Sequence, residues 1–321
     1  MIALKANPRC RSELSARRSG WFGAYGGGAS RGATNVTADA TGALRGLPFA
    51  KMTGSGNDFV FFDGRAVPTD LVTSPEAIQR ICNRYNGIGA DGVVVLEPLA
   101  RDADVRIHYF NSDGTAADLC GNATLCSTAL AAEIGMAAPS GMRLTTGAGL
   151  ITSRLNDLPE IDFQPVREIR DALPIALDSG EQRVGFAVAG IPHLVLLTND
   201  AESVDVNVRG PVLRWHPETG AKGANVNWVS SLPDGRWRYR TFERGVEGET
   251  LACGTGAVAT AVMLAQWGLI SGDTVTILTS SGRDVTVFLR PRVESAGGTR
   301  EYFPTLRGEG RVVFRGTIET L

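Results

Sequence analysis

Two runs of small apolar residues stand out along the chain, and each begins with a Cys-Gly pair. Residues 120–135 begin Cys120-Gly121-Asn122, and residues 253–268 begin Cys253-Gly254-Thr255. Each run ends at a glycine fifteen residues after its cysteine, where a helix C-cap glycine is expected. The pattern predicts two helices with a cysteine at each N-terminus. Because both runs are apolar nearly all round, both helices are expected to be buried on every side.

Shorter segments with period-two alternation, or with β-branched and aromatic content, predict strands around these helices. The expected strands are Phe59–Phe62, Val93–Leu96, Asp104–Phe110, Met142–Thr146, Leu150–Leu155, Val184–Val188, Leu194–Leu197, Asn225–Val229, Trp237–Phe242, Val275–Leu278, Val285–Leu289 and Arg311–Ile318. In both parts of the chain an alternating strand, a polar turn, a Cys-Gly helix and a hairpin follow in that order. Asn111 precedes Cys120 by nine residues, and Arg244 precedes Cys253 by nine. The repeated order predicts an internal duplication.

The predicted fold class is α/β, of the α+β type, with two pseudo-symmetric domains. Each domain is expected to curl a mostly antiparallel sheet around its central apolar helix, with the active site in the cleft between the domains. We place the first domain at residues 47–178, joined by the C-terminal strand at 311–321, and the second at 179–290. Residues 291–310, rich in Gly, Pro and charge, are predicted to form a loop or insertion.

Residues 1–46 differ in composition from the rest of the chain. They hold seven Lys and Arg residues against Glu13 and Asp39, and they lack a sustained apolar period. Such a segment buries too little surface to offset the entropy of ordering it. We predict a disordered N-terminal extension or an upstream start codon, with an Arg-rich transit peptide as the alternative.

The composition of the chain is that of an ordinary globular protein, with 43% hydrophobic residues, 21% charged residues and a net charge of −2. No basic stripe interleaved with aromatics suggests a nucleic-acid partner, and no apolar run approaches the roughly 20 residues that span a bilayer. The five cysteines are an odd number and widely spaced. Together with the lack of a signal-peptide pattern, this predicts reduced thiols in a cytoplasmic protein.

A thiol at a helix N-terminus is placed where an anion is stabilised. The exposed N–H groups and the helix dipole favour the thiolate, and the same N–H groups can hold a carboxylate. The donors would come from Gly121, Asn122, Gly254 and Thr255. Two thiols on opposite faces of one carbon, one as thiolate and one as thiol, can remove a proton and return another to the opposite face. This two-base chemistry inverts a stereocentre and needs no cofactor, and the two thiols would titrate as a coupled pair.

Other interpretations exist for several of these residues. Cys10, Cys82 and the mid-helix Cys126 are expected to be inert small hydrophobes. A disulfide between Cys120 and Cys253 would be an inactive oxidised form, and a metal site is not expected because neither a CxxC pair nor a histidine cluster is present. His193 is either a turn residue or a tuner of the thiols. Glu243-Arg244 is either a solvated ion pair or a ligand contact, and its place ahead of the second helix favours the contact.

Seven short motifs, in order, resemble those of the diaminopimelate epimerase family. They are Lys51-Met-Thr-Gly-Ser-Gly-Asn-Asp-Phe59, Gly87-Ile-Gly-Ala-Asp91, Phe110-Asn-Ser-Asp-Gly114, Cys120-Gly-Asn122, Asn225-Val-Asn227, Glu243-Arg-Gly245 and Gly248-Glu-Thr-Leu-Ala-Cys-Gly-Thr-Gly256. Enzymes of this family interconvert LL- and meso-diaminopimelate without a cofactor, on the route to lysine and peptidoglycan. The resemblance implies the same fold of two pseudo-symmetric halves and a homodimer.

The resemblance also implies roles for individual residues. Cys120 and Cys253 would be the acid–base pair. Substrate binding would fall to Asn57, Asn111, Gly121, Asn122, Asn225, Glu243, Arg244, Gly254 and Thr255. Arg244 and the asparagines would bind the distal amino-acid end, and the two helix starts would bind the reacting carboxylate. His193 and Glu243 stand where the family has residues that tune the cysteine pKa values.

The chain departs from the family pattern at two positions. The family often has Asn in the Asn-Pro-His turn, where Ile191 stands here. A Gln often follows the Asp of the Gly-Ile-Gly loop, where Gly92 stands here. These changes affect the expected affinity and specificity more than the reaction type.

Three other functions compete with this interpretation. A proline racemase or hydroxyproline epimerase resembles this chain in its two cysteines, but usually has His in place of Asn122 and lacks the Glu-Arg-Gly motif. A non-catalytic binding protein of this fold would be marked by loss of one cysteine. A cysteine hydrolase would need an oriented histidine base, and the chain has only three histidines.

Overall fold

The computed structural model describes residues 43–293 and 300–321, and these residues belong to one compact unit. The predicted extension at residues 1–46 lies almost wholly outside the described residues, as does Cys10. The boundary at residue 47 was set too late, because Leu44 is only 2% exposed and packs in a core cluster with Val60 and Ile318. No helix in the described part of the chain is long and apolar enough to cross a membrane.

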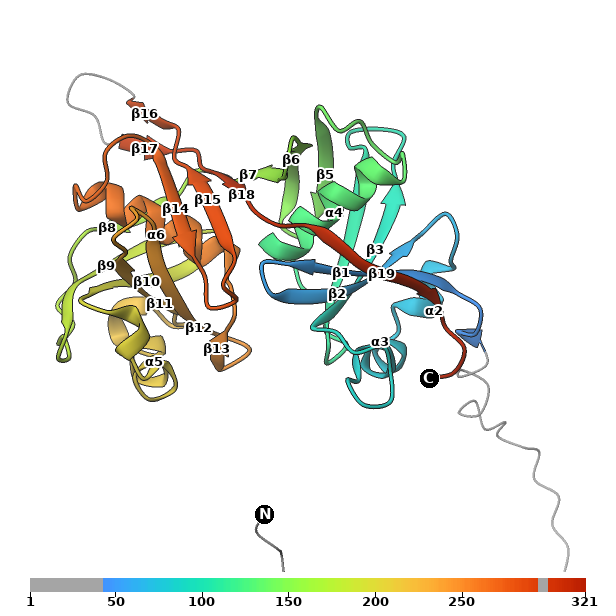
Figure 1. Ribbon diagram of the computed structural model, residues 1–321, viewed down its shortest axis with the longest axis horizontal. Coiled ribbons are helices and arrows are strands. Elements are labelled where there is room, and N and C mark those ends of the chain that lie inside the picture. Colours follow the sequence, from blue (N-terminus) through green and yellow to red (C-terminus); the bar gives the residue numbers. More distant parts are fainter. Residues whose placement is uncertain (1–42, 294–299) are drawn as a thin grey trace, which may run out of the picture. The chain divides into compact units, whose positions relative to one another are not determined.

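The first repeat of strands surrounds the helix α4 (Figure 1). Its elements are β1 (Pro48–Gly54), β2 (Asn57–Asp63), α2 (Thr69–Val72), α3 (Pro75–Cys82), β3 (Gly92–Pro98), β4 (Val105–Asn111), α4 (Gly121–Glu133), β5 (Met142–Thr146), β6 (Gly149–Leu155) and β7 (Pro159–Asp162). The Ser74 side chain accepts a hydrogen bond from the Ala77 amide and caps α3, as the Ser-Pro start predicts. The C-terminal strand β19 (Arg311–Thr317) pairs antiparallel with β1.

The second repeat of strands surrounds α6. Its elements are β8 (Arg167–Arg170), β9 (Glu181–Ala189), β10 (Ile191–Thr198), η1 (Ala201–Ser203), α5 (Val206–Arg214), η2 (Pro217–Thr219), β11 (Asn225–Ser231), β12 (Trp237–Glu243), β13 (Gly248–Thr250), α6 (Gly254–Gln266), β14 (Thr274–Leu278) and β15 (Asp284–Phe288). The predicted start of this half at residue 179 was too late, because β8 already pairs with β9 and Val166 packs with α6 residues.

The order of strand pairing is the same in both repeats. The β1–β2, β3–β4 and β5–β6 pairs are antiparallel, and the β2–β3 and β4–β5 pairs between them are parallel. In the second repeat, β9–β10, β11–β12 and β14–β15 are antiparallel, and β10–β11 and β12–β14 are parallel. The duplication inferred from the sequence is therefore present in the hydrogen-bonding pattern, and the mixed α/β fold with mostly antiparallel strands is confirmed.

The segment at residues 291–310 is not simply a loop, which corrects the prediction. It contains β16 (Pro291–Val293) and β17 (Arg300–Tyr302), which pair with each other, and β18 (Thr305–Arg307). β18 pairs with β15 on one side and with β7 on the other, so it joins the strands of the two repeats. Thr305 and Leu306 are both fully buried. Each of these strands has only three residues, which is too short for alternation to stand out against flanking Gly and charge.

Both predicted Cys-Gly helices are confirmed. α4 begins directly after Cys120 and α6 directly after Cys253, so each cysteine is the N-cap. Gly135 and Gly268 follow the helix ends with φ of +66° and +69°, the left-handed conformation that glycine adopts without strain. Every residue from Gly254 to Leu264 is buried, and nearly every residue of α4 is too.

Candidate active site

The N-termini of α4 and α6 are in contact. A Cβ built on Gly121 would lie 3.4 Å from the Gly254 Cα, and one built on Gly254 would lie 3.4 Å from the Gly121 Cα. The Asn122 Nδ2 atom also donates to the Ala252 carbonyl, at 3.2 Å. A Cβ on Gly254 would also lie 3.0 Å from the Leu306 Cδ2 atom, so the packing around this glycine is tight. The structure thus brings together the two Cys-Gly motifs that lie far apart in the sequence.

Cys253 is surrounded by hydrogen-bond donors. Its sulfur lies 3.6 Å from Asn225 Nδ2, 3.3 Å from Thr255 Oγ1 and 3.4 Å from the Gly256 amide, which caps α6 through this contact. Cys253 is only 7% exposed, and burial raises the pKa of its thiol far above the usual range, with Glu243 adding to the effect. Its donors lower the pKa but do not offset burial.

Cys120 has a different set of neighbours. Burial raises its pKa to about 11, with the nearby Ala123 and Asn122 amides lowering it and Glu243 raising it. The Tyr109 hydroxyl is within hydrogen-bonding reach of the sulfur, and burial keeps that phenol protonated by raising its pKa. Cys120 is partly exposed whereas Cys253 is buried, so burial raises the pKa of Cys120 less than that of Cys253.

These pKa directions correct the expectation that the helix starts favour thiolates in the unliganded protein. The helix N–H groups do lower both pKa values, but the loss of hydration outweighs them. The helix dipole acts through the local backbone, whereas burial depends on the packing of the whole fold.

Glu243 lies close to both thiols. It accepts a hydrogen bond from the Thr250 hydroxyl and is within hydrogen-bonding reach of the Cys253 thiol. Burial raises its own pKa, and its charge raises the pKa of Cys120 and of Cys253. Glu243 is thus placed to disfavour two thiolates at once and to keep Cys253 as a thiol.

We expect Glu243→Gln to shift thiol alkylation toward lower pH. In the free enzyme, iodoacetamide should label Cys120 before Cys253, at a rate rising toward the Cys120 pKa of about 11. Removing the carboxylate charge lowers both thiol pKa values, so labelling should begin at lower pH. Peptide mass spectrometry resolves the two cysteines. Glu247→Gln is the matched control, because Glu247 perturbs neither thiol; equal shifts in both variants would contradict the assignment.

His193 is fully buried. Asn227 Nδ2 lies 3.2 Å from its Nδ1 atom, and the Asn227 Oδ1 atom accepts from the Tyr239 hydroxyl at 2.8 Å. Burial first, and then the Arg244 charge, lower the His193 pKa to about 3. His193 is therefore neutral near pH 7, so it does not stabilise a thiolate with a positive charge. A chain of hydrogen bonds connects His193 to Cys253 through Asn227 and Tyr239. The Tyr239 hydroxyl lies 3.4 Å from the Cys253 carbonyl.

The predicted substrate-binding residues lie in different surroundings. Asn57 accepts from Asn122 Nδ2 at 2.6 Å, next to the helix starts. Asn225 contacts Cys253 and accepts from the Arg244 amide at 3.0 Å, while Thr255 contacts Cys253. Asn111 bonds only locally, through Nδ2 to the Thr115 hydroxyl at 3.1 Å, and among the described residues no polar contact joins it to the thiols. The structure thus brings all but Asn111 together by direct contacts.

The two departures from the family pattern have different structural settings. A Cβ built on Gly92 would lie 2.4 Å from the Phe110 carbonyl and 2.8 Å from the Tyr109 ring, so no side chain fits there. The Tyr109 ring lies beside Gly92, and its hydroxyl is within hydrogen-bonding reach of Cys120. Ile191 begins β10 opposite Ala189 and is partly buried.

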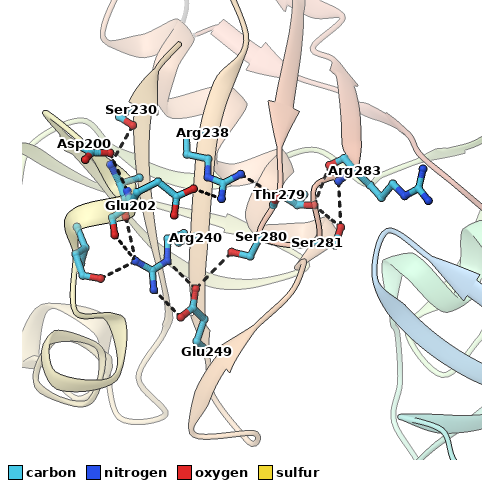
Figure 2. Close-up of polar contacts among 12 residues, drawn as sticks. Asp200, Glu202, Ser230, Arg238, Arg240, Glu249, Thr279, Ser280, Ser281 and Arg283 are labelled. Carbon is cyan, nitrogen blue, oxygen red and sulfur yellow. Dashed lines mark hydrogen bonds and ion pairs between the residues drawn. The ribbon is translucent and has the colours of Figure 1, made fainter. Parts of the chain in front are cut away.

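A polar network supports the strand that carries Thr250 (Figure 2). The Arg240 Nε and Nη2 atoms each lie 2.7 Å from the Glu249 carboxylate, and Nη1 donates to the carbonyls of Ala201, Glu202 and Val204. Glu249 also accepts from the Ser280 hydroxyl at 3.4 Å. The Arg240 and Glu249 side chains are only 17% and 22% exposed, so their ion pair fixes β13 against β12 and η1.

We expect Glu249→Ala to lower the free energy of unfolding by about 2 kcal/mol, because it removes the hydrogen bonds between a carboxylate and a mostly buried guanidinium. Asp234→Ala is the control, because it breaks the exposed Arg236 pair on the neighbouring hairpin and should have little effect. Urea unfolding measures both changes. Equal destabilisation by the two variants would contradict the support role.

Some residues of this site had no signal in the sequence. Tyr109 was assigned only to a strand, Thr250 lay inside a motif without a role, and Asp91 was part of a glycine-rich loop. Their contacts with Cys120, Glu243 and Asn57 arise from tertiary packing. Among the described residues, no group of three or more His, Cys, Asp or Glu side chains is arranged to hold a metal ion.

Comparison with solved structures identifies the fold. A hydroxyproline epimerase from Agrobacterium vitis superimposes with a TM-score of 0.62 at 20% identity, covering 85% of this chain and 92% of that one. A PhzF-family phenazine biosynthesis protein of Bacillus anthracis gives a TM-score of 0.64 at 15% identity, covering 86% and 99%. The fold is thus the one shared by proline racemase-like epimerases and PhzF proteins.

Sequence comparison narrows this class to one family. The family model described as diaminopimelate epimerase matches residues 49–162 and 186–296. The diaminopimelate epimerase of Gemmatimonas aurantiaca is 69% identical over 277 residues, which is 86% of this chain and all of that protein. That of Aquifex aeolicus is 35% identical over 252 residues, 75% of this chain and 89% of that protein. The chain belongs to the diaminopimelate epimerase family.

Proposed function

We propose that this protein interconverts LL- and meso-2,6-diaminopimelate by cofactor-independent proton transfer between Cys120 and Cys253. The observation that carries the proposal is the contact between two helix N-termini, each capped by a free cysteine. Two thiols so placed can reach opposite faces of one α-carbon. Family membership supports diaminopimelate as the substrate, and the reaction would supply lysine and peptidoglycan synthesis.

In one direction, the Cys120 thiolate takes the α-proton and the Cys253 thiol delivers its proton to the opposite face. The lower pKa of Cys120 and the carboxylate of Glu243 beside Cys253 support this assignment of resting states. The turnover leaves Cys120 as thiol and Cys253 as thiolate, so the reverse reaction begins from that form. The amides of Gly121, Asn122, Gly254 and Thr255 would hold the reacting carboxylate, onto which the carbanion charge spreads.

The decisive experiment incubates the protein with LL-diaminopimelate in deuterated water, without added cofactor. We expect deuterium at one α-carbon of the meso product and none at the other. Absence of exchange would refute the proposal. Proline and trans-4-hydroxyproline serve as comparison substrates, since faster exchange with either would favour the racemase-like alternative.

We further propose that the two repeats act as separate domains with the site between them, and that the enzyme is a cytoplasmic homodimer. Free cysteines in the described residues and a biosynthetic substrate support the cytoplasm. The edge strand β19 pairs only with β1 among the described strands and exposes Val313 and Phe314 at 49% and 47%, which supports a second copy covering it.

We expect Phe314→Glu to shift the protein toward the monomer, because a charge on this edge opposes strand association. Light scattering against protein concentration measures the change. Val246→Glu, at an exposed residue on the β12–β13 turn, is the control. An unchanged dimer in the Phe314 variant would place the interface elsewhere.

A further inference from the structure

One buried acceptor at the contact of the two helix starts has no donor. Asn122 is 2% exposed, and its Oδ1 atom has no hydrogen-bond partner among the described residues. That oxygen lies 3.8 Å from where a Cβ on Gly254 would be, between the two Cys-Gly motifs. A buried acceptor without a donor has lost its hydrogen bonds to water without replacement, so such an atom calls for a donor from a ligand.

The orientation of the Asn122 amide follows from its neighbours. Its Nδ2 atom donates to Asn57 Oδ1 at 2.6 Å and to the Ala252 carbonyl at 3.2 Å. The Ala252 carbonyl can only accept, so the amino side of the Asn122 amide must face it. This leaves Oδ1 as the acceptor that points to the helix starts.

The orientation of Asn57 is fixed in the same way by Asp91. The Asn57 Nδ2 atom donates to Asp91 Oδ2 at 3.0 Å, and a carboxylate only accepts. The Asn57 carbonyl oxygen therefore turns to Asn122. Three donors hold Asp91 itself: the Asp58 amide at 3.2 Å and Asn57 on Oδ2, and Arg84 Nη2 at 2.6 Å on Oδ1.

We infer that Asn122 Oδ1 binds the ammonium group of the substrate's reacting end, and that Asp91 is the positioning residue that orients it through Asn57. This inference rests on the proposed function. An amino acid carries a carboxylate and an ammonium on the same α-carbon, and the helix starts offer donors for the first and Asn122 an acceptor for the second. A carboxylate would be repelled from Oδ1, so the amide also sets which way round the α-carbon binds.

Gly92 and Tyr109 bear on which group can bind the ammonium. Residue 92 has no side chain, and the Tyr109 ring lies next to it. The Tyr109 hydroxyl forms a hydrogen bond with Cys120 and is therefore not free for a ligand. Asn122 Oδ1 is a buried acceptor at the helix starts that has no partner among the described residues, so it is available to bind an ammonium.

The test compares diaminopimelate with 2-aminopimelate, which lacks one ammonium group. If 2-aminopimelate inhibits without exchanging its own α-hydrogen, its ammonium-free end occupies the reacting position. Asn122→Ala should then lower kcat/KM for diaminopimelate about tenfold or more, while the inhibition constant changes far less. If 2-aminopimelate does exchange, its ammonium occupies that position, and Asn122→Ala should slow its exchange as it slows diaminopimelate turnover.

Asp91 variants separate positioning from folding. Asp91→Ala removes the acceptor for Asn57 and should lower kcat/KM about tenfold as well. Asp91→Asn should recover most of the activity, because its carbonyl oxygen can still accept from Asn57. Its amino group cannot accept from Arg84, but the exposed Arg84 guanidinium keeps its bonds to Asp58. Asp234→Asn is the control, since Asp234 pairs with Arg236, makes no contact with this network and should retain activity.

Two failures remain distinguishable. Absence of deuterium uptake by the wild-type protein refutes the proposed function. A second outcome refutes only the ammonium site. In it the wild type takes up deuterium, and Asn122→Ala weakens inhibition by a non-exchanging 2-aminopimelate as much as it lowers kcat/KM for diaminopimelate. The ammonium site is also refuted if Asp91→Ala and Asp91→Asn are equally impaired, or if Asn122→Ala leaves turnover of diaminopimelate unchanged.

Discussion

Replacing Cys120 or Cys253 by alanine should abolish epimerisation, lowering kcat by about a thousandfold or more while the protein still folds. General acid–base groups contribute about 10²–10⁴-fold to rate, and neither thiol can replace the other because they face opposite sides of the α-carbon. The loss should be as large for either variant, since inversion needs one proton removed and one returned. Epimerisation is followed by chiral chromatography of the products.

Cys126→Ala is the matched control for this pair of variants. Like Cys120→Ala, it removes one thiol, but Cys126 is fully buried inside α4, away from the N-terminus that Cys120 caps. We expect it to cost some stability through the cavity left behind but to retain turnover. Near-wild-type turnover in Cys120→Ala or Cys253→Ala would contradict the two-base mechanism.

The single-cysteine variants also carry information about the separate faces. Each single-cysteine variant keeps one thiol. The substrate configuration whose α-hydrogen faces that thiol can still lose a proton to it and regain one on the same side. Deuterium uptake without inversion, for one configuration only in each variant, would assign each thiol to its face. Uptake with both configurations in one variant would mean that a second base exists.

The two Cys-Gly helices could be predicted because the information is local. Small apolar residues in an unbroken run, closed by Gly135 or Gly268 at positive φ, define each helix without reference to the rest of the chain. The duplication could be predicted from the repeated succession of segments, but the parallel pairs β2–β3, β4–β5, β10–β11 and β12–β14 could not. β18 did not follow, because its three residues gain their place only by pairing with β7, more than a hundred residues earlier.

The electrostatics of the site could not be predicted in the same way. The helix dipole acts on Cys253 locally and was recognised, but the opposing effect of burial depends on how β12, β13 and α6 pack together. The orientation of Asn122 likewise depends on Asp91, a residue of a distant loop that the sequence marked only as a turn. Long-range contacts of this kind decide the sign of a pKa shift or the orientation of an amide.

Arg244→Met should lower kcat/KM for diaminopimelate by about a hundredfold or more without destabilising the protein. Within residues 43–293 and 300–321 no hydrogen bond or ion pair engages the Arg244 guanidinium, whose pKa is lowered by burial and by the neighbouring Arg214 charge. Arg240, on the same strand, is paired with Glu249 and has a raised pKa. An arginine held near another cation without a carboxylate is suited to a carboxylate from the substrate.

A short substrate separates this role from a general effect on the site. An amino acid without a distal carboxylate, such as alanine, should exchange its α-hydrogen slowly in the wild type and equally slowly in Arg244→Met. If the variant slows both substrates by the same factor, Arg244 acts at the reacting end instead. The kcat/KM of Arg244→Lys for diaminopimelate should lie between those of the wild type and Arg244→Met, because an ammonium keeps the charge but loses the two parallel hydrogen bonds.

Stability gives an independent readout for Arg244. Removing a partly desolvated cation beside Arg214 relieves repulsion, so urea unfolding of Arg244→Met should show an unchanged or higher free energy of unfolding. A residue that weakens the fold while it supports binding is expected where a site is kept ready for a charged ligand. A clear loss of stability in Arg244→Met would mean that the guanidinium has a structural partner, and the carboxylate assignment would then fail.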